Sequence, residues 1–132
     1  MADHGIYFEH DEDPLILVRQ VGTCSDAQVE AYLQQMRIVL WRTEPYALIY
    51  DLREGVPFNS KQRAMQSKLI TEADADLDNR FSGPVAFVEN SMLMRGAMQA
   101  AMWLNPPTYE YLITSDMDQA RRWARQRLPL AA

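Results

Sequence analysis

The stretch Tyr46-Ala47-Leu48-Ile49-Tyr50 is a nearly unbroken run of apolar residues with the length of a β-strand. Such a run predicts a central strand covered on both faces, because a half-exposed strand would alternate apolar and polar side chains. A loop is expected directly after it, over residues 51–57, and a long helix is expected to begin at Asn59 or Ser60. The centre of the fold is therefore predicted to be a buried strand followed by a crossover helix.

Two shorter strands are predicted before this central one. Residues 5–10 place Ile6 and Phe8 on one face, and a β-rich apolar run begins at Leu15 and ends at Gly22. The segment between them, residues 11–14, contains three acidic residues and a proline, which is typical of a turn. Two strands joined by so short a turn predict an antiparallel hairpin.

Helices alternate with strands through the rest of the chain. Ser25 and Gln28 have the spacing of a capping box, so a helix is expected to begin between them, and Pro45 is expected to end it near Thr43. The remaining predicted elements are a strand at 85–88, a helix at 91–104, a strand at 109–113 and a final helix opened by Ser115 and Asp118.

This order, β-β-α-β-α-β-α-β-α, predicts an α/β fold with a mixed, mostly parallel sheet of about five strands and four helices. The first strand is expected to be antiparallel to the second. The length of 132 residues corresponds to a single domain over residues 1–132. Side chains predicted to be largely buried are those of Leu33, Leu48, Ile49, Leu69, Val85, Phe87 and Trp123.

Three stretches of the sequence carry a resemblance to a known family. Ala47–Arg53 resembles the central strand of STAS domains with its terminal "vDlr" signature. Val85–Val88 followed by Leu93–Gly96 resembles the family's "vafV" strand and the next helix, and Met117–Trp123 resembles its terminal "eeAlaWL" helix. The chain is similar to STAS domains, the fold of bacterial anti-sigma-factor antagonists, and especially to their SpoIIAA-like branch.

The resemblance implies a candidate regulatory residue. In signalling members of the family a partner kinase phosphorylates a serine at the start of the helix after the central strand, and the phosphate disrupts the partnership. Ser60 is the nearest counterpart, nine positions after Asp51, whereas signalling members have a tighter connection. A phosphate at a helix N-terminus would be favoured by its free N–H groups, although helix capping beside Asn59 explains a hydroxyl here equally well.

Composition and charge exclude several classes of function. The net charge of −5 and the pI near 4.9 argue against binding to nucleic acids or to anionic membranes. Arg121, Arg122, Arg125 and Arg127 in the final helix are interpreted as solubilising charges. The sequence contains no stretch of 18 apolar residues, so no membrane-spanning helix is predicted. The single cysteine, Cys24, fits a reducing compartment, so the cytoplasm is the expected location.

No catalytic or metal-binding constellation emerges from the sequence. His4, His10 and Cys24 do not assemble into a nucleophile, base and orienting group, and no phosphate loop or dinucleotide glycine pattern is found. The acidic segment Asp74-x-Asp76-x-Asp78 mimics the opening of a calcium loop but lacks the required glycine and the terminal glutamate. The prediction is a non-enzymatic domain without a metal or cofactor.

The segment from Ser91 to Leu104 is the most unusual part of the sequence, because its predicted helix is apolar nearly all round. One interpretation is an ordinary core helix that fills gaps with methionine. The alternatives are a methionine-lined ligand pocket and an interface between two copies of the chain. By helical phase, Met94, Met98 and Trp103 are predicted to point away from Leu93, Ala97 and Leu104. The candidate ligand or interface residues are Met94, Met98, Met102 and Trp103.

Two functions follow from these observations. The first is a non-enzymatic regulatory domain that works through protein–protein contact with an unidentified partner, and within a homodimer. The alternative is a domain that binds a small apolar ligand or lipid, with the helix at 91–104 as a pocket wall. A methionine-lined cavity of ~300 Å³ or more would favour the ligand, and a flat exposed patch burying roughly 800 Å² per partner would favour association.

Overall fold

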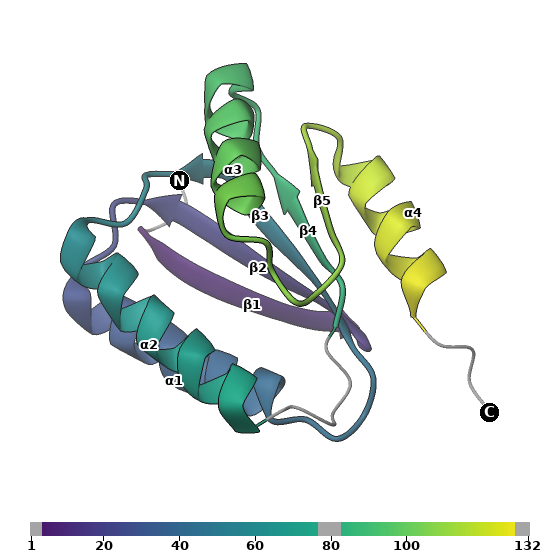
Figure 1. Cartoon of the computed structure of the whole chain (residues 1–132), viewed down its shortest axis with the longest axis horizontal. Coiled ribbons are helices and arrows are strands. Elements are labelled where there is room, and N and C mark those ends of the chain that lie inside the picture. Colours follow the sequence, from purple (N-terminus) through teal and green to yellow (C-terminus); the bar gives the residue numbers. More distant parts are fainter. Residues whose placement is uncertain (1–3, 77–82, 129–132) are drawn as a thin grey trace.

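The computed structural model describes residues 4–76 and 83–128. Its elements follow the predicted order (Figure 1). The strands are β1 (Gly5–Glu12), β2 (Leu15–Gly22), β3 (Ala47–Gly55), β4 (Val85–Val88) and β5 (Tyr111–Thr114), and the helices are α1 (Asp26–Leu40), α2 (Ser60–Asp76), α3 (Met92–Leu104) and α4 (Met117–Arg127).

The five strands form one sheet in the order β1-β2-β3-β4-β5. β1 is antiparallel to β2, and every later pair is parallel, which confirms the predicted mixed sheet. Each connection from β2 to β5 moves one strand in the same direction. Because right-handed crossovers in one direction place their helices on one face, α1, α2 and α3 lie on the same side of the sheet (Figure 1). The helix α4 covers the opposite face.

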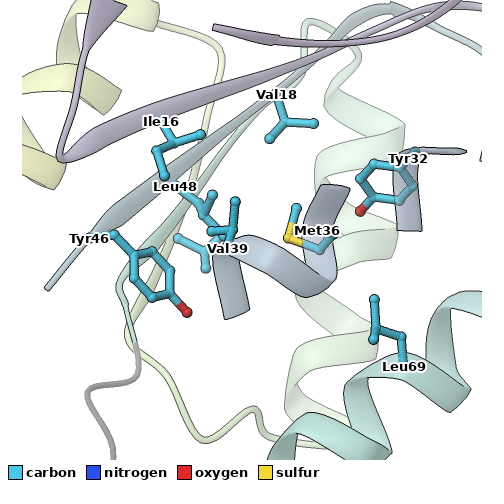
Figure 2. Close-up of a cluster of buried hydrophobic side chains, with 9 residues drawn as sticks. Ile16, Val18, Tyr32, Met36, Val39, Tyr46, Leu48 and Leu69 are labelled. Carbon is cyan, nitrogen blue, oxygen red and sulfur yellow. The ribbon is translucent and has the colours of Figure 1, made fainter. Parts of the chain in front are cut away.

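The two faces of the sheet have separate cores, because successive side chains of a strand point to opposite sides. On the first face, side chains from β2, from β3 and from Tyr46 just before it meet those from α1 and α2. Figure 2 shows Ile16, Val18, Tyr32, Met36, Val39, Tyr46, Leu48 and Leu69. On the second face, Ile49 and Val88 pack beside Ala47, Ala86, Ala120 and Ala124. The small alanine side chains allow α4 to lie close against the strands.

Helix boundaries agree with the capping signals in part. The predicted capping box is present, with the amide of Gln28 donating to the Ser25 hydroxyl at 3.1 Å and the Ser25 amide donating to the Gln28 side chain at 2.9 Å. The helix ends at Leu40, earlier than predicted. At α4 the predicted opening at Ser115 is wrong by one residue, since the side chain of Asp116 accepts from the amides of Asp118 and Gln119.

The predicted loop over residues 51–57 is wrong, because β3 continues to Gly55. The continuation pairs with the end of β2, with Val21 opposite Glu54 and Gly22 opposite Gly55. An ion pair of 2.8 Å between Arg19 and Glu54 joins the two strands at this point. The charged side chains that suggest a loop are therefore partnered side chains at the end of a strand.

The core prediction is confirmed for Leu48, Ile49, Leu69 and Val85, which are buried. Leu33, Phe87 and Trp123 are partly buried and pack against the two cores, so none of the seven side chains is exposed to solvent. Leu33 and Phe87 border a cavity on the first face of the sheet, and the Arg127 guanidinium lies 4.4 Å from the ring centroid of Trp123. The sequence also predicts that the helix beginning near Asn59 stops at Ser82-Gly83-Pro84, because glycine and proline disfavour helix, and this segment falls partly outside the described residues.

Candidate functional site

Polar contacts fix the start of α3 and join its middle to β5. At its start the Ser91 hydroxyl accepts from the amide of Met94 at 3.2 Å. Arg95 donates to the backbone carbonyls of Glu89 and Asn90, each at 2.8 Å, and Gln99 donates to the Tyr111 hydroxyl at 2.8 Å. The bond of Gln99 joins α3 to β5, and the bonds of Arg95 fix the helix to the segment that precedes it.

The interpretation of this segment as a core helix is wrong. All of α3 lies within the described part of the chain, and none of its 13 residues is buried. The side that faces the sheet carries Met94, Met98 and Met102, each half-buried, together with Arg95 and Gln99. An apolar helix whose inner side is only half-covered leaves unfilled space between itself and the strands.

The outer side of α3 is apolar and exposed to solvent. Its four large side chains are 79% (Met92), 83% (Leu93), 73% (Trp103) and 88% (Leu104) exposed. Between them lie the small exposed residues Gly96, Ala97, Ala100 and Ala101. We refer to these eight positions as the outer face of α3.

The predicted orientation of Trp103 is wrong. It was expected to share a side with Met94 and Met98, yet it lies on the outer face with Leu93 and Leu104. Trp103 is nine residues from Met94, and at 3.6 residues per turn nine residues correspond to about two and a half turns, which places the two side chains on opposite sides. The four candidate residues are therefore divided: three methionines on the inner side and the tryptophan outside.

A cavity of about 740 Å³ lies on the face of the sheet that α1, α2 and α3 cover. Leu48, Tyr50 and Phe87 of the strands line it, together with Leu69 of α2 and with Met94 and Met98 of α3. Its volume falls within the range of about 300–1,000 Å³ that is usual for small-molecule sites. The cavity is therefore larger than the ~300 Å³ at which a methionine-lined cavity favours ligand binding over association.

A neutral hydrogen-bonded network lies in the wall of this cavity. The hydroxyls of Tyr32 and Tyr50 are 2.9 Å apart, Gln66 donates to Tyr32 at 3.3 Å, and Tyr50 donates to the sulfur of Met36 at 3.7 Å. Burial raises the pKa of Tyr32 to about 12 and that of Tyr50 well above its usual value. Both phenols are therefore uncharged at neutral pH, and they offer hydrogen bonds without charge.

The positively charged group at the cavity wall is Arg63, near the start of α2. Its guanidinium donates to the Phe58 carbonyl and to the Ser60 hydroxyl, both at 3.2 Å. Both acceptors are uncharged, and no carboxylate of the described residues forms an ion pair with Arg63. The acidic residues that line the cavity are Asp74 and Glu89.

Ser60, the candidate phosphoacceptor, is exposed and is the first residue of α2. Its hydroxyl is not the cap of the helix. Asn59 has that role, since its side chain accepts from the amide of Gln62 at 2.9 Å and its own amide donates to the Gln62 side chain at 3.2 Å. The capping explanation therefore applies to Asn59 and leaves the Ser60 hydroxyl in contact with Arg63.

A buried carboxylate, Asp51, lies in the middle of β3. Asp51 accepts two hydrogen bonds of 2.9 Å from the Arg53 guanidinium and one of 3.2 Å from the Arg53 amide. Burial opposes ionisation of Asp51, but these bonds outweigh it and lower the pKa of the carboxyl. The pair orders the polar end of the strand.

The described residues contain no group of three His, Cys, Asp or Glu side chains that could hold a metal ion. Asp74 and Asp76 lie at the end of α2 with exposed side chains, and Asp78 falls outside the described residues. Cys24 is buried, and burial raises the pKa of its thiol, so it is a poor nucleophile. Within residues 4–76 and 83–128, no helix has the length and apolar character needed to cross a membrane.

Three of the arginines of α4 form ion pairs with carboxylates elsewhere in the domain. Arg121 and Arg125 both contact the carboxylate of Glu12 in β1, and Arg127 forms an ion pair of 3.0 Å with Glu110. Three of the four arginines interpreted as solubilising charges therefore also attach α4 to the rest of the domain. They do not form a free basic stripe.

Comparison with solved structures identifies the fold. The chain matches no protein-family model, and no curated protein matches it in sequence. An uncharacterized protein of the DUF3478 family from Shewanella loihica, described as having a SpoIIAA-like fold, superposes with a TM-score of 0.65 at 19% identity and covers 94% of this chain and 97% of its own. The chain therefore has the α/β fold of SpoIIAA-like domains, as its motifs predict.

Two further structures support this assignment. The anti-sigma factor antagonist SpoIIAA in its unphosphorylated form has a TM-score of 0.60 at 14% identity, with coverage of 92% of this chain and 98% of its own. An anti-sigma factor antagonist from Mycobacterium paratuberculosis has a TM-score of 0.55 at 18% identity, with coverage of 91% and 92%. The likeness extends over nearly the whole of each chain.

Proposed function

We propose that this chain is a non-enzymatic regulatory domain that acts through protein–protein contact, with the outer face of α3 as its contact surface. The observation that carries the proposal is the exposure of Met92, Leu93, Trp103 and Leu104 on one side of one helix. Soluble monomers rarely expose a contiguous apolar patch larger than a few hundred Å². Two of the similar structures are anti-sigma factor antagonists, which supports a regulatory role.

The size of the outer face matches what a protein partner requires. At about 150 Å² for a large apolar side chain, the four large residues offer on the order of 600 Å². The small residues between them bring the patch towards the roughly 800 Å² that each partner buries in a stable complex. The outer face is therefore large enough for specific association.

When the protein is isolated, the partner that best fits the outer face of α3 is a second copy of the chain. The outer face carries no charge, so two copies meet without burying unpaired charges. Gly96 and Ala100 are four residues apart on this side, and such small residues let two helix backbones approach closely. A symmetric helix pair would also shelter Trp103, the largest exposed apolar side chain.

Sedimentation of the wild type and of two glutamate variants tests this proposal. Leu93→Glu places a charge within the outer face, so the dimer should dissociate to monomers. Ile38→Glu is the matched control, because Ile38 of α1 is 73% exposed and lies outside α3; this variant should remain dimeric. A wild type that sediments as a monomer at its highest soluble concentration, or a Leu93→Glu variant that remains a dimer, would overturn the proposal.

Ser60 supplies a site at which such contact can be regulated. A phosphate on its hydroxyl would lie at the N-terminus of α2, where free amides and the helix dipole favour negative charge. Arg63 already donates to this hydroxyl and would form a charge-assisted bond with the phosphate. The proposed function therefore includes phosphorylation of Ser60 by a kinase. The proposed location is the cytoplasm, because a reducing compartment keeps the thiol of Cys24 free.

A further inference from the structure

The cavity beneath α3 has the composition of a binding site for an amphiphilic small molecule. Its walls are mostly apolar or aromatic, and they include Leu48, Leu69 and Phe87 as well as the two methionines Met94 and Met98. Methionine is flexible and polarisable, so it adapts its shape to a neighbouring apolar molecule. Because the lining is mostly apolar, a molecule that fills this space of about 740 Å³ has an apolar body.

Charge at the cavity wall indicates the polar end of that molecule. Arg63 contacts only uncharged oxygens among the described residues, and its planar guanidinium matches a carboxylate in two parallel hydrogen bonds. The Tyr32–Tyr50 network is neutral and does not favour a charged group beside it. Asp74 and Glu89 would repel an anion, so they exclude the acidic end group from their parts of the wall.

We propose that the cavity beneath α3 binds an elongated monocarboxylic acid, with its hydrocarbon part against Met94 and Met98 and its carboxylate at Arg63. The contacts involve the inner side of α3, whereas self-association uses the outer face. Ligand binding therefore does not depend on the proposed protein contact. A dimeric protein and its monomeric Leu93→Glu variant bind the acid alike.

Calorimetric titration with laurate, below the concentration at which it forms micelles, tests the site, and dodecanol serves as the uncharged comparison. Wild type should bind one laurate per chain. Arg63→Gln should weaken laurate binding about tenfold or more, the loss expected for a charge-assisted pair, and leave dodecanol binding unchanged. Met98→Trp places a rigid, bulkier ring in the cavity wall where the hydrocarbon part would lie, and it should weaken binding of both molecules.

Met92→Trp is the matched control, because Met92 lies on the outer face of the same helix. This variant should bind laurate as the wild type does. Absence of laurate binding by the wild type would overturn the proposal, and so would equal losses in Met92→Trp and Met98→Trp. Unchanged laurate binding by Arg63→Gln would overturn the assignment of the carboxylate. Thermal unfolding of each variant verifies that a lost signal comes from the site and not from misfolding.

Discussion

Two neighbouring residues of β3 should respond very differently to truncation to alanine. Ile49 is fully buried against α4, among Ala86, Ala120 and Val88. Leu48 is also buried, but its side chain lines the cavity on the other face. Because the two residues are adjacent in the same strand, a difference in the stability lost on truncation reports how tightly each face of the sheet is packed.

The magnitudes follow from transfer and cavity contributions. Each substitution removes apolar groups worth about 2.4 kcal/mol, taken as about three groups at about 0.8 kcal/mol each. Ile49→Ala also creates a closed void of roughly 70 Å³, which costs about 1.7 kcal/mol more at about 24 cal/mol per Å³. The total is about 4 kcal/mol for Ile49→Ala. Leu48→Ala enlarges a space that already exists, so its cost should remain near 2.5 kcal/mol.

Equilibrium unfolding in urea, followed by circular dichroism, measures both free energies of unfolding. The expected result is a larger loss for Ile49→Ala, by more than about 1 kcal/mol, at a similar dependence on urea concentration. Equal losses, or a larger loss for Leu48→Ala, would show that the first face is packed as tightly as the second. The inference of an open cavity at Leu48 would then be wrong.

Three further predictions concern charge. The raised pKa of Tyr32, about 12, means that folding favours the neutral phenol. Its contribution to the free energy of unfolding is therefore complete below pH ~10 and is lost as pH rises towards 12. Across this range, the free energy of unfolding measured in urea should fall more steeply for the wild type than for Tyr32→Phe. The lowered pKa of Asp51 means that its ionised form stabilises the fold above the unfolded pKa of ~3.9 and that this contribution is lost as pH falls below it. Arg53→Gln should destabilise the fold at pH 7 by on the order of 2 kcal/mol, because the mostly buried carboxylate of Asp51 loses its partner. Arg122→Gln, at an exposed position of α4, is the control, and an equal loss of stability in both variants would contradict this prediction. Ser60→Asp should weaken laurate binding severalfold by engaging Arg63, with dodecanol binding unchanged, and a titration in which both molecules lose affinity equally would contradict competition for the guanidinium.

The sequence predicts those parts of the fold in which local and tertiary preferences agree. The capping box at Ser25 and Gln28 and the short apolar strand Val85–Val88 both appear where the pattern places them. The end of β3 does not, because Arg53 and Glu54 look like loop residues until their partners Asp51 and Arg19 are known. Long-range pairing of charged side chains leaves no periodic signal in one sequence.

The candidate site could be predicted only in outline. The unusual composition of the helix at 91–104 is evident in the sequence, and helical phase alone would have separated Trp103 from Met94. Whether the inner methionines touch the sheet depends on how far α3 lies from the strands, which is a property of the whole domain. Arg63 carried no signal in the sequence, since its importance comes from the uncharged acceptors around it and the cavity beside it.

The alanines between α4 and the sheet have a consequence for how the protein can evolve. Ala47, Ala86, Ala120 and Ala124 are completely enclosed, so a larger side chain at any of them would have to displace the helix. The methionine-lined side has spare volume, and substitutions there change its shape without forcing the backbone to move. Mutations that alter what the domain recognises can therefore accumulate on one side of the sheet while purifying selection holds the other side constant.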